Sequence, residues 1–205
     1  MTAAVRHWLQ LFLLIPGSML ASCATLAPTA PPAEPATYLP HLQSITKIHA
    51  FELRGRIGVL TEKKGFSGLM HWHHHEEGDD IGLYSPLGSQ LGQINADADG
   101  VTLITSDQKI HRATDAETLT EQTMGWSLPL SGLNDWVLGR PAAGAMEILA
   151  WDEAGHIAHL RQNGWDIEYP QYVEVNAIQL PAKIVLKSAR IDLRLVVESW
   201  QTDAD

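Results

Sequence analysis

From residue 51 onward, the chain repeatedly alternates apolar and polar positions with a period of two. Within residues 51–59, the odd positions are apolar or glycine, whereas Glu52, Arg54 and Arg56 occupy even positions. Successive side chains of a strand point to opposite faces of a sheet, so this pattern predicts a strand that is buried on one face only. The last segment of this kind, residues 190–200, shows the clearest alternation.

Further short segments of the same kind, separated by turn-forming residues, predict a largely antiparallel sheet. The stretches 76–80, 86–89 and 97–100 are rich in Gly, Asp, Glu and Pro, which favour turns. Additional strands are expected at residues 68–74, 81–85, 90–96, 101–105, 109–113, 146–151, 156–162, 165–169, 173–179 and 184–186.

Three short helices are also expected. Residues 37–51 have approximate helical spacing of their apolar side chains. Thr114 and Glu117 have the spacing of a capping box, which predicts the start of a second helix. Ser131 is expected to cap a third. The resulting class is α+β with a mostly β body, built as an antiparallel barrel or a strongly curved sheet.

The first 22 residues have the features of a secretion signal. Arg6 is followed by a short apolar run, which ends in Leu20-Ala21-Ser22-Cys23. The run is much shorter than the ~20 apolar residues that cross a bilayer as a helix. The final tetrad resembles the bacterial lipobox, in which diacylglycerol is attached to the cysteine thiol. Cys23 is the only cysteine of the chain. We therefore expect cleavage before Cys23, lipidation of its thiol, and no disulfide.

The remaining chain divides into a tether and one domain. Residues 23–37 are rich in Pro, Ala and Thr, which predicts an extended linker, and residues 38–205 are sufficient for one globular domain. The net charge of −10 argues against binding to nucleic acid or to anionic lipids. An aspartate after the lipidated cysteine resembles an inner-membrane retention signal. Ala24 at that position therefore indicates the outer membrane, with the protein facing the periplasm.

A cluster of histidines is the most conspicuous candidate for chemistry. His71, His73 and His75 would share one face of a strand at a spacing of about 7 Å, which is compatible with zinc. The alternative is a solvated strand end that leads into an acidic turn, and we expect neither a metal nor a cofactor. The chain has no G-x-S-x-G or H-E-x-x-H motif. An enzyme is therefore the weaker hypothesis.

The turn at residues 84–89 has an apolar tip. Pro86 and Gly88 favour the turn, and Leu87 lies between them, although turn tips are usually polar. Leu87 either packs back against the domain or enters the acyl layer of a membrane. Burial in that layer would be worth about 1.5–3 kcal/mol.

Several motifs taken together resemble those of the LolB family of outer-membrane lipoprotein receptors. The likeness extends over nearly the whole chain, in order. The motifs are the lipobox, RGRIG at 54–58, Trp72, SPLGS at 85–89, GWSLPL at 125–130, LNDWVLGRP at 133–141, QNGW at 162–165 and Leu180-Pro181.

The resemblance implies an incomplete, half-open antiparallel β-barrel that short helices close around an apolar cavity, similar in fold to the periplasmic carrier LolA. It implies a monomer that accepts lipoproteins from a LolA-like carrier, holds their acyl chains and inserts them into the outer membrane. It further implies that Leu87 protrudes, between Pro86 and Gly88, and promotes insertion. The alternative is a lipid-binding or structural outer-membrane lipoprotein without transfer activity. The candidate lining residues of the cavity are Leu53, Ile57, Met70, Trp72, Leu83, Leu103, Trp136, Ile184, Leu186, Leu193 and Leu195.

Overall fold

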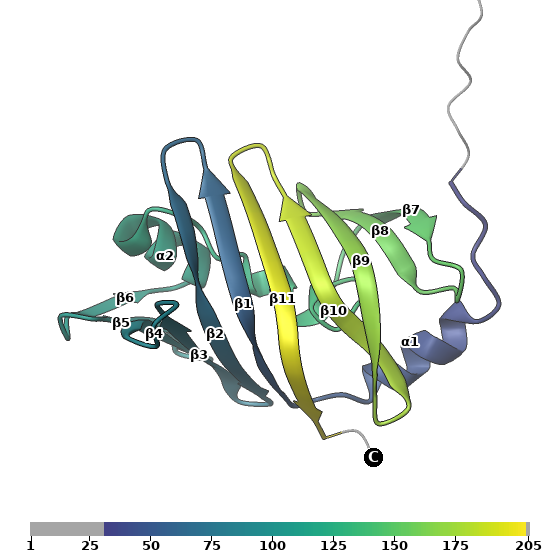
Figure 1. Cartoon of the computed structure of the whole chain (residues 1–205), viewed down its shortest axis with the longest axis horizontal. Coiled ribbons are helices and arrows are strands. Elements are labelled where there is room, and N and C mark those ends of the chain that lie inside the picture. Colours follow the sequence, from purple (N-terminus) through teal and green to yellow (C-terminus); the bar gives the residue numbers. More distant parts are fainter. Residues whose placement is uncertain (1–30, 204–205) are drawn as a thin grey trace, which may run out of the picture. The chain divides into compact units, whose positions relative to one another are not determined.

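The computed structural model describes residues 31–203 (Figure 1). The expected signal segment and Cys23 lie outside the described residues. Among the described residues, no helix combines the length and the apolar character needed to cross a membrane. The helices are α1 (Tyr38–Thr46), α2 (Ala116–Met124) and α3 (Leu130–Trp136). The strands are β1 (Phe51–Thr61), β2 (Gly65–His75), β3 (Gly78–Tyr84), β4 (Gln90–Asp97), β5 (Gly100–Thr105), β6 (Ile110–Ala113), β7 (Met146–Trp151), β8 (Ile157–Gln162), β9 (Trp165–Val175), β10 (Ile178–Lys187) and β11 (Ile191–Thr202).

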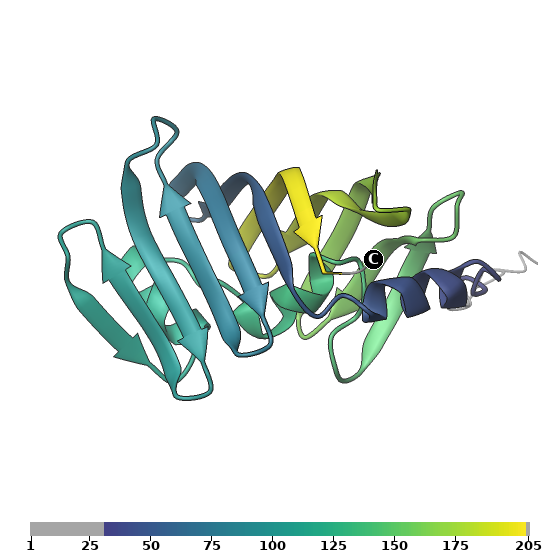
Figure 2. The same cartoon turned by 90° about the horizontal axis from the view of Figure 1, so that it is seen from below.

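All of these strands belong to one antiparallel sheet, in the order β6-β5-β4-β3-β2-β1-β11-β10-β9-β8-β7. The first and last strands of the domain, β1 and β11, pair at the centre of this sheet. β6 and β7 form its two edges, so the sheet stays open and curves around α2 and α3 (Figures 1 and 2). The predicted class, a mostly β fold built on a half-open antiparallel sheet, is confirmed.

The alternating pattern determines which face of the sheet is buried. In β1, Leu53, Ile57 and Val59 are buried, whereas Arg54 and Arg56 are exposed on the opposite face. Neighbouring strands repeat this arrangement, and their inward side chains join those of α2 and α3 in one apolar core. Burial of each large aliphatic side chain contributes about 1.5–3 kcal/mol, so this core is the main source of stability.

A glycine permits the closest backbone approach between the two central strands. A Cβ atom on Gly55 would lie 2.3 Å from the carbonyl oxygen of Val196, well inside van der Waals contact. The pairing register of β1 and β11 shifts between Arg54 and Gly55. Such a bulge bends the strand, and only a residue without a side chain fits at this point.

The caps of the second and third helices differ from the prediction. The carboxylate of Asp115, rather than the Thr114 hydroxyl, accepts a hydrogen bond of 2.7 Å from the N–H of Thr118. Glu117 does not close a capping box, because its Oε1 accepts hydrogen bonds from the N–H and the hydroxyl of Ser131. Ser131 therefore ties α3 to α2 instead of capping α3. Asp is among the strongest N-caps, which explains its use here.

The strands predicted at 165–169 and 173–179 have other boundaries in the structure. β9 runs continuously through Pro170, and the turn lies at Asn176 and Ala177, whose φ angles are 49° and 61°. Positive φ at both central residues is typical of a two-residue hairpin turn. Pro170 is accommodated because the pairing of β9 with β10 changes register opposite it, and a bulge needs no ladder N–H there.

A buried glutamine fixes the end of α3 to the sheet. Gln162 is 2 % exposed, and its Oε1 accepts hydrogen bonds of 2.9 Å from both Trp136 Nε1 and the N–H of Ala142. Its Nε2 donates to the carbonyl of Ala142 at 2.8 Å. One side chain thus satisfies three polar groups that would otherwise be buried without a partner.

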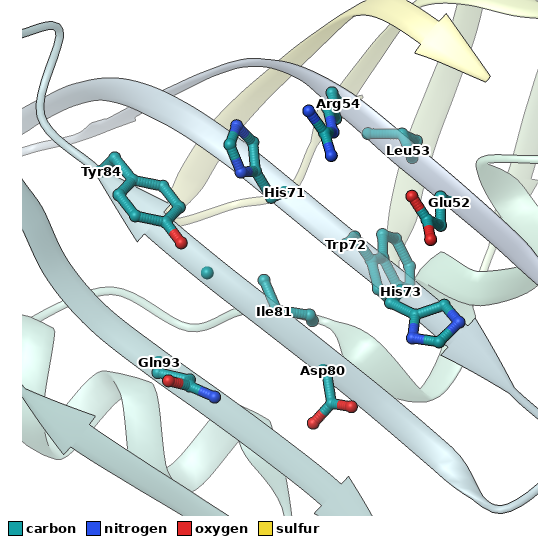
Figure 3. A pocket seen from close by; sticks show the side chains of 11 residues that line it. Glu52, Leu53, Arg54, His71, Trp72, His73, Asp80, Ile81, Tyr84 and Gln93 are labelled. Atoms are coloured by element: carbon teal, nitrogen blue, oxygen red, sulfur yellow. The ribbon is translucent and has the colours of Figure 1, made fainter. Parts of the chain in front are cut away.

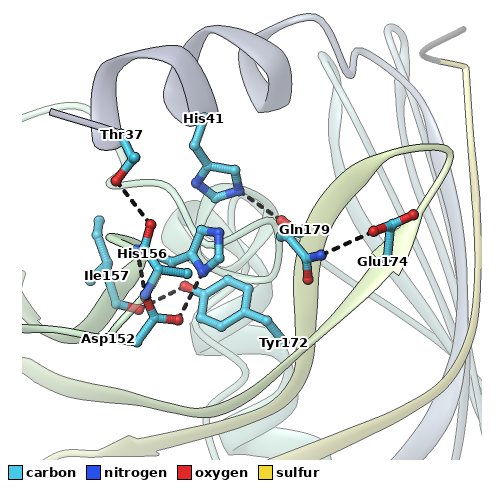
Figure 4. Close-up of polar contacts among 9 residues, drawn as sticks. Thr37, His41, Asp152, His156, Ile157, Tyr172, Glu174 and Gln179 are labelled. Carbon is cyan, nitrogen blue, oxygen red and sulfur yellow. Dashed lines mark hydrogen bonds and ion pairs between the residues drawn. The ribbon is translucent and has the colours of Figure 1, made fainter. Parts of the chain in front are cut away.

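Two histidines hold α1 against the far end of the sheet (Figure 4). His41 Nε2 donates to the carbonyl oxygen of Gln179 in β10 at 2.8 Å, and its ring meets the ring of His156 edge-on at a centroid distance of 4.4 Å. His156 Nδ1 in turn lies 2.8 Å from Asp152 Oδ2. Burial is the main cause that lowers the pKa of His41, opposed by its hydrogen bond to Gln179, so the docked helix favours the neutral ring.

Candidate functional site

The side chains predicted to line the cavity meet in the interior, between the sheet and the helices. All of them are at most 1 % exposed, and all belong to the same core cluster. Leu53, Ile57 and Leu195 come from the centre of the sheet, and Trp136 comes from α3. In this structure the side chains pack against one another, so the interior is filled by its own lining. Occupation by an acyl chain would require these side chains to move apart.

The packed core reaches the surface at the end of α2. A hollow of about 330 Å³ is bordered there by Val59, Phe66, Met124 and Trp126. The rings of Phe66 and Trp126 are stacked, with centroids 5.8 Å apart and planes inclined by 23°. Sequence reasoning did not place these residues at a functional site, although Trp126 belongs to the GWSLPL motif. The hollow brings core side chains to the surface beside the polar residues Thr61, Lys64 and Thr105.

The loop between β3 and β4 presents an apolar side chain to solvent. Leu87 is 96 % exposed. The loop is closed beneath it by hydrogen bonds from the N–H of Ser85 to the carbonyl of Ser89, 2.8 Å, and from the N–H of Gly88 to the carbonyl of Ser85, 2.9 Å. Gly88 has a φ of 84°, which favours glycine. Leu87 could either pack back against the domain or be exposed, and the structure shows it exposed. The loop that carries it is held by its own backbone hydrogen bonds.

A comparison with known families gives the family of the chain. Residues 49–200 match the family model described as "Outer membrane lipoprotein LolB". This match covers the sheet except the last two residues of β11, the helices α2 and α3, and the Leu87 loop. The chain belongs to the LolB family.

Individual LolB relatives support the assignment over most of their length. The outer-membrane lipoprotein LolB of Thiobacillus denitrificans is 37 % identical over 89 % of this chain and 92 % of its own. The protein of the same name from Pseudomonas savastanoi is 33 % identical over 82 % of each chain. A DUF1329 family protein from Desulfovibrio piger shares only the fold, with a TM-score of 0.52 and 7 % identity, over 83 % of this chain and 94 % of its own.

The side chains of His71, His73 and His75 do not come together in a way that could hold one metal ion. In the described part of the chain, the ligand atoms that come within 4.8 Å of one another belong to His159, Asp166 and Glu168, on β8 and β9. There Arg161 and Lys187 already bond the two carboxylates. The rings of His73 and His75 lie 5.3 Å apart on the outer face of β2, and His71 lies beyond them.

His74, the inward neighbour of these histidines, has a structural role in the LolB fold. Its Nδ1 lies 2.7 Å from Oδ1 of Asp79, which also accepts a 2.7 Å hydrogen bond from Trp72 Nε1. Asp79 is only 8 % exposed. A buried carboxylate is expensive unless it is paired, and these two donors compensate it. Sequence reasoning grouped His74 with a solvated strand end, and missed this anchor.

Proposed function

We propose that this protein is an outer-membrane-anchored receptor that accepts lipoproteins from a LolA-like periplasmic carrier and inserts them into the outer membrane. Membership of the LolB family supports this role. The observation that carries the mechanism is the combination of a largely apolar interior with one exposed leucine on an ordered loop. The first feature suits acyl chains, and the second suits the acyl layer of a membrane.

In this proposal, the lipidated Cys23 holds the receptor at the membrane, and residues 23–37 give the domain freedom to reach both the carrier and the bilayer. Three acyl chains on Cys23 would anchor it firmly. The residue after the cysteine, Ala24, supports the outer membrane as its location.

The acyl chains of the client enter at the hollow beside Phe66 and Trp126 and displace the packed core side chains. Each buried methylene contributes about 0.8 kcal/mol, which offsets the cost of opening the core. Transfer proceeds without an energy source if the receptor binds acyl chains more tightly than the carrier and the bilayer binds them more tightly still. The proposal involves no bond cleavage, and therefore no catalytic residue, metal or cofactor.

The test uses the mature chain with Cys23→Ala, so that it stays in solution. The domain is mixed with a cognate carrier that holds a fluorescent lipoprotein, and gel filtration shows which protein carries the label. Movement of the label to this protein is the expected result. Retention on the carrier, with this domain folded, would favour the alternative of a lipid-binding or structural lipoprotein without transfer activity.

A further inference from the structure

A polar groove of about 270 Å³ lies on the outer face of the sheet, opposite the apolar core (Figure 3). It crosses four neighbouring strands, β1 to β4, and opens on the face opposite the core, although the core residues Leu53, Trp72 and Ile81 border it. Its lining residues are Glu52, Leu53, Arg54, His71, Trp72, His73, Asp80, Ile81, Gly82, Tyr84 and Gln93.

The strand register arranges the charges of the groove in two rows. Arg54 lies opposite His71, which lies opposite Gly82, and Gly82 lies opposite Gln93. This row is cationic or hydrogen-bond donating, with no carboxylate, and Tyr84 closes it on the side of the loop. The ring of Tyr84 lies 4.8 Å from the ring of His71 and covers Gly82, where a Cβ atom would come within 2.8 Å of it.

The second row is acidic. Glu52 lies opposite His73, and His73 lies opposite Asp80. Because alternate residues of a strand are about 6.6 Å apart, the acidic row lies about that far from the cationic row. Figure 3 shows the same order, with Arg54 and His71 toward Tyr84, and with Glu52 and His73 away from it. The groove therefore has a positive end and a negative end.

The two charged residues of β1 in this groove are available to a ligand. Neither Arg54 nor Glu52 takes part in an ion pair among the residues that the structure describes. The next outward residue of the same strand, Arg56, is paired with Glu198 at 2.8 Å. Arg54 is exposed, so its guanidinium can form charge-assisted hydrogen bonds.

The positive end of the groove lies next to the Leu87 loop. Tyr84 is the last residue of β3, and Leu87 follows three residues later, at most about 10 Å away along the chain. Each interfacial layer of a bilayer is roughly 5–8 Å thick. When Leu87 enters the acyl layer, Tyr84 therefore lies near the depth of the lipid headgroups. Arg54 and His71 are aligned with Gly82, about 6.6 Å farther from the loop, on the aqueous side of Tyr84. The acidic row is then farther from the membrane centre.

We propose that this groove binds the headgroup of a zwitterionic phospholipid, with its phosphate at Arg54 and His71 and its ammonium toward Glu52. The Tyr84 hydroxyl and the Gln93 amide donate further hydrogen bonds to the phosphate. A net charge of −10 repels anionic lipids and free phosphate, whereas a headgroup without net charge avoids this cost. The inference rests on the proposed docking of Leu87 at a membrane and is independent of acyl binding in the core.

The test uses a soluble headgroup, glycerophosphoethanolamine, titrated into the mature Cys23→Ala protein and followed by NMR. We expect saturable shifts at Arg54, His71 and Glu52. Arg54→Gln should weaken this binding about tenfold or more, as expected for loss of a charge-assisted hydrogen bond. Arg56→Gln, which removes the same charge from the same strand face, should leave it unchanged. Unchanged thermal unfolding of both variants shows that they are folded.

Further measurements distinguish a lipid headgroup from free phosphate as the ligand. They also test this inference separately from the proposed function. Glycerophosphoglycerol and inorganic phosphate should bind at least tenfold more weakly. Equal binding of the three compounds would mean that the groove is an adventitious anion site only, and would overturn the inference. Equal effects of Arg54→Gln and Arg56→Gln would also overturn it. Leu87→Glu should lose binding to phosphatidylethanolamine-containing vesicles but retain soluble headgroup binding. Arg54→Gln should accept lipoprotein from the carrier normally, so failure of headgroup binding and failure of lipoprotein receipt are read separately.

Discussion

Replacement of Leu87 by glutamate tests whether acceptance of a lipoprotein and its insertion are separate steps. Leu87 is 96 % exposed, and the bonds that close its loop join backbone and Ser85 atoms, not its side chain. Leu87→Glu should therefore change the free energy of unfolding by no more than about 0.5 kcal/mol. The buried core, which the 96 % exposed Leu87 does not join, should also be unaffected.

The effect on insertion follows from the area of one leucine. Its transfer from water into the acyl layer is worth about 1.5–3 kcal/mol, and a tenfold change corresponds to about 1.4 kcal/mol. Loss of that term alone lowers productive membrane contact roughly 10- to 150-fold, and the glutamate charge adds to the loss. Leu87→Ala, which retains part of the apolar area, should give an intermediate value.

The assay follows one fluorescent lipoprotein through both steps. Gel filtration measures its transfer from the carrier to the receptor, and flotation with liposomes measures its release from the receptor into lipid. We expect Leu87→Glu to leave the first step within about twofold of the unmodified protein and to slow the second by about tenfold or more. Leu39→Glu, a matched change at a 54 % exposed leucine of α1, is the control. Parallel loss of both steps, or an equal effect of Leu39→Glu on flotation, would refute the reasoning.

Two further predictions concern the scaffold. Gln162→Leu leaves the Trp136 indole N–H and both peptide groups of Ala142 without their hydrogen-bond partner. The free energy of unfolding, measured by urea titration, should therefore fall by at least about 2 kcal/mol. A fall below about 0.5 kcal/mol would contradict the bridging role of Gln162. Because the folded pKa of His41 is lowered from 6.5, its contribution to stability is complete above that pH and declines as the pH falls below it. Unfolding free energies at pH 7.5 and 5.5 should therefore differ more for the unmodified protein than for His41→Gln, and equal differences would exclude His41 as the source.

Much of the fold follows from local patterns in the sequence. Alternation predicted the strand at 51–59 and placed Leu53 and Ile57 on its buried face, because a half-buried strand must present one apolar face. The residues that cap the helices were harder to predict from the sequence. Thr114 and Asp115 both offer an oxygen near the same N–H groups, and only the backbone geometry of the folded chain selects Asp115.

The sequence alone determined the likeness to LolB, the apolar character of the strands, and the presence of a leucine at the tip of a Pro-Gly turn. The tertiary structure decided that Leu87 is exposed, since no side chain of the domain lies close enough to cover it in the described residues. It also decided the register that aligns Arg54 with His71 and Glu52 with His73. Such pairings depend on long-range hydrogen bonds between strands, and a shift of one residue would place these charges on the opposite face. The charged groove beside the loop is therefore visible only once the strands are paired.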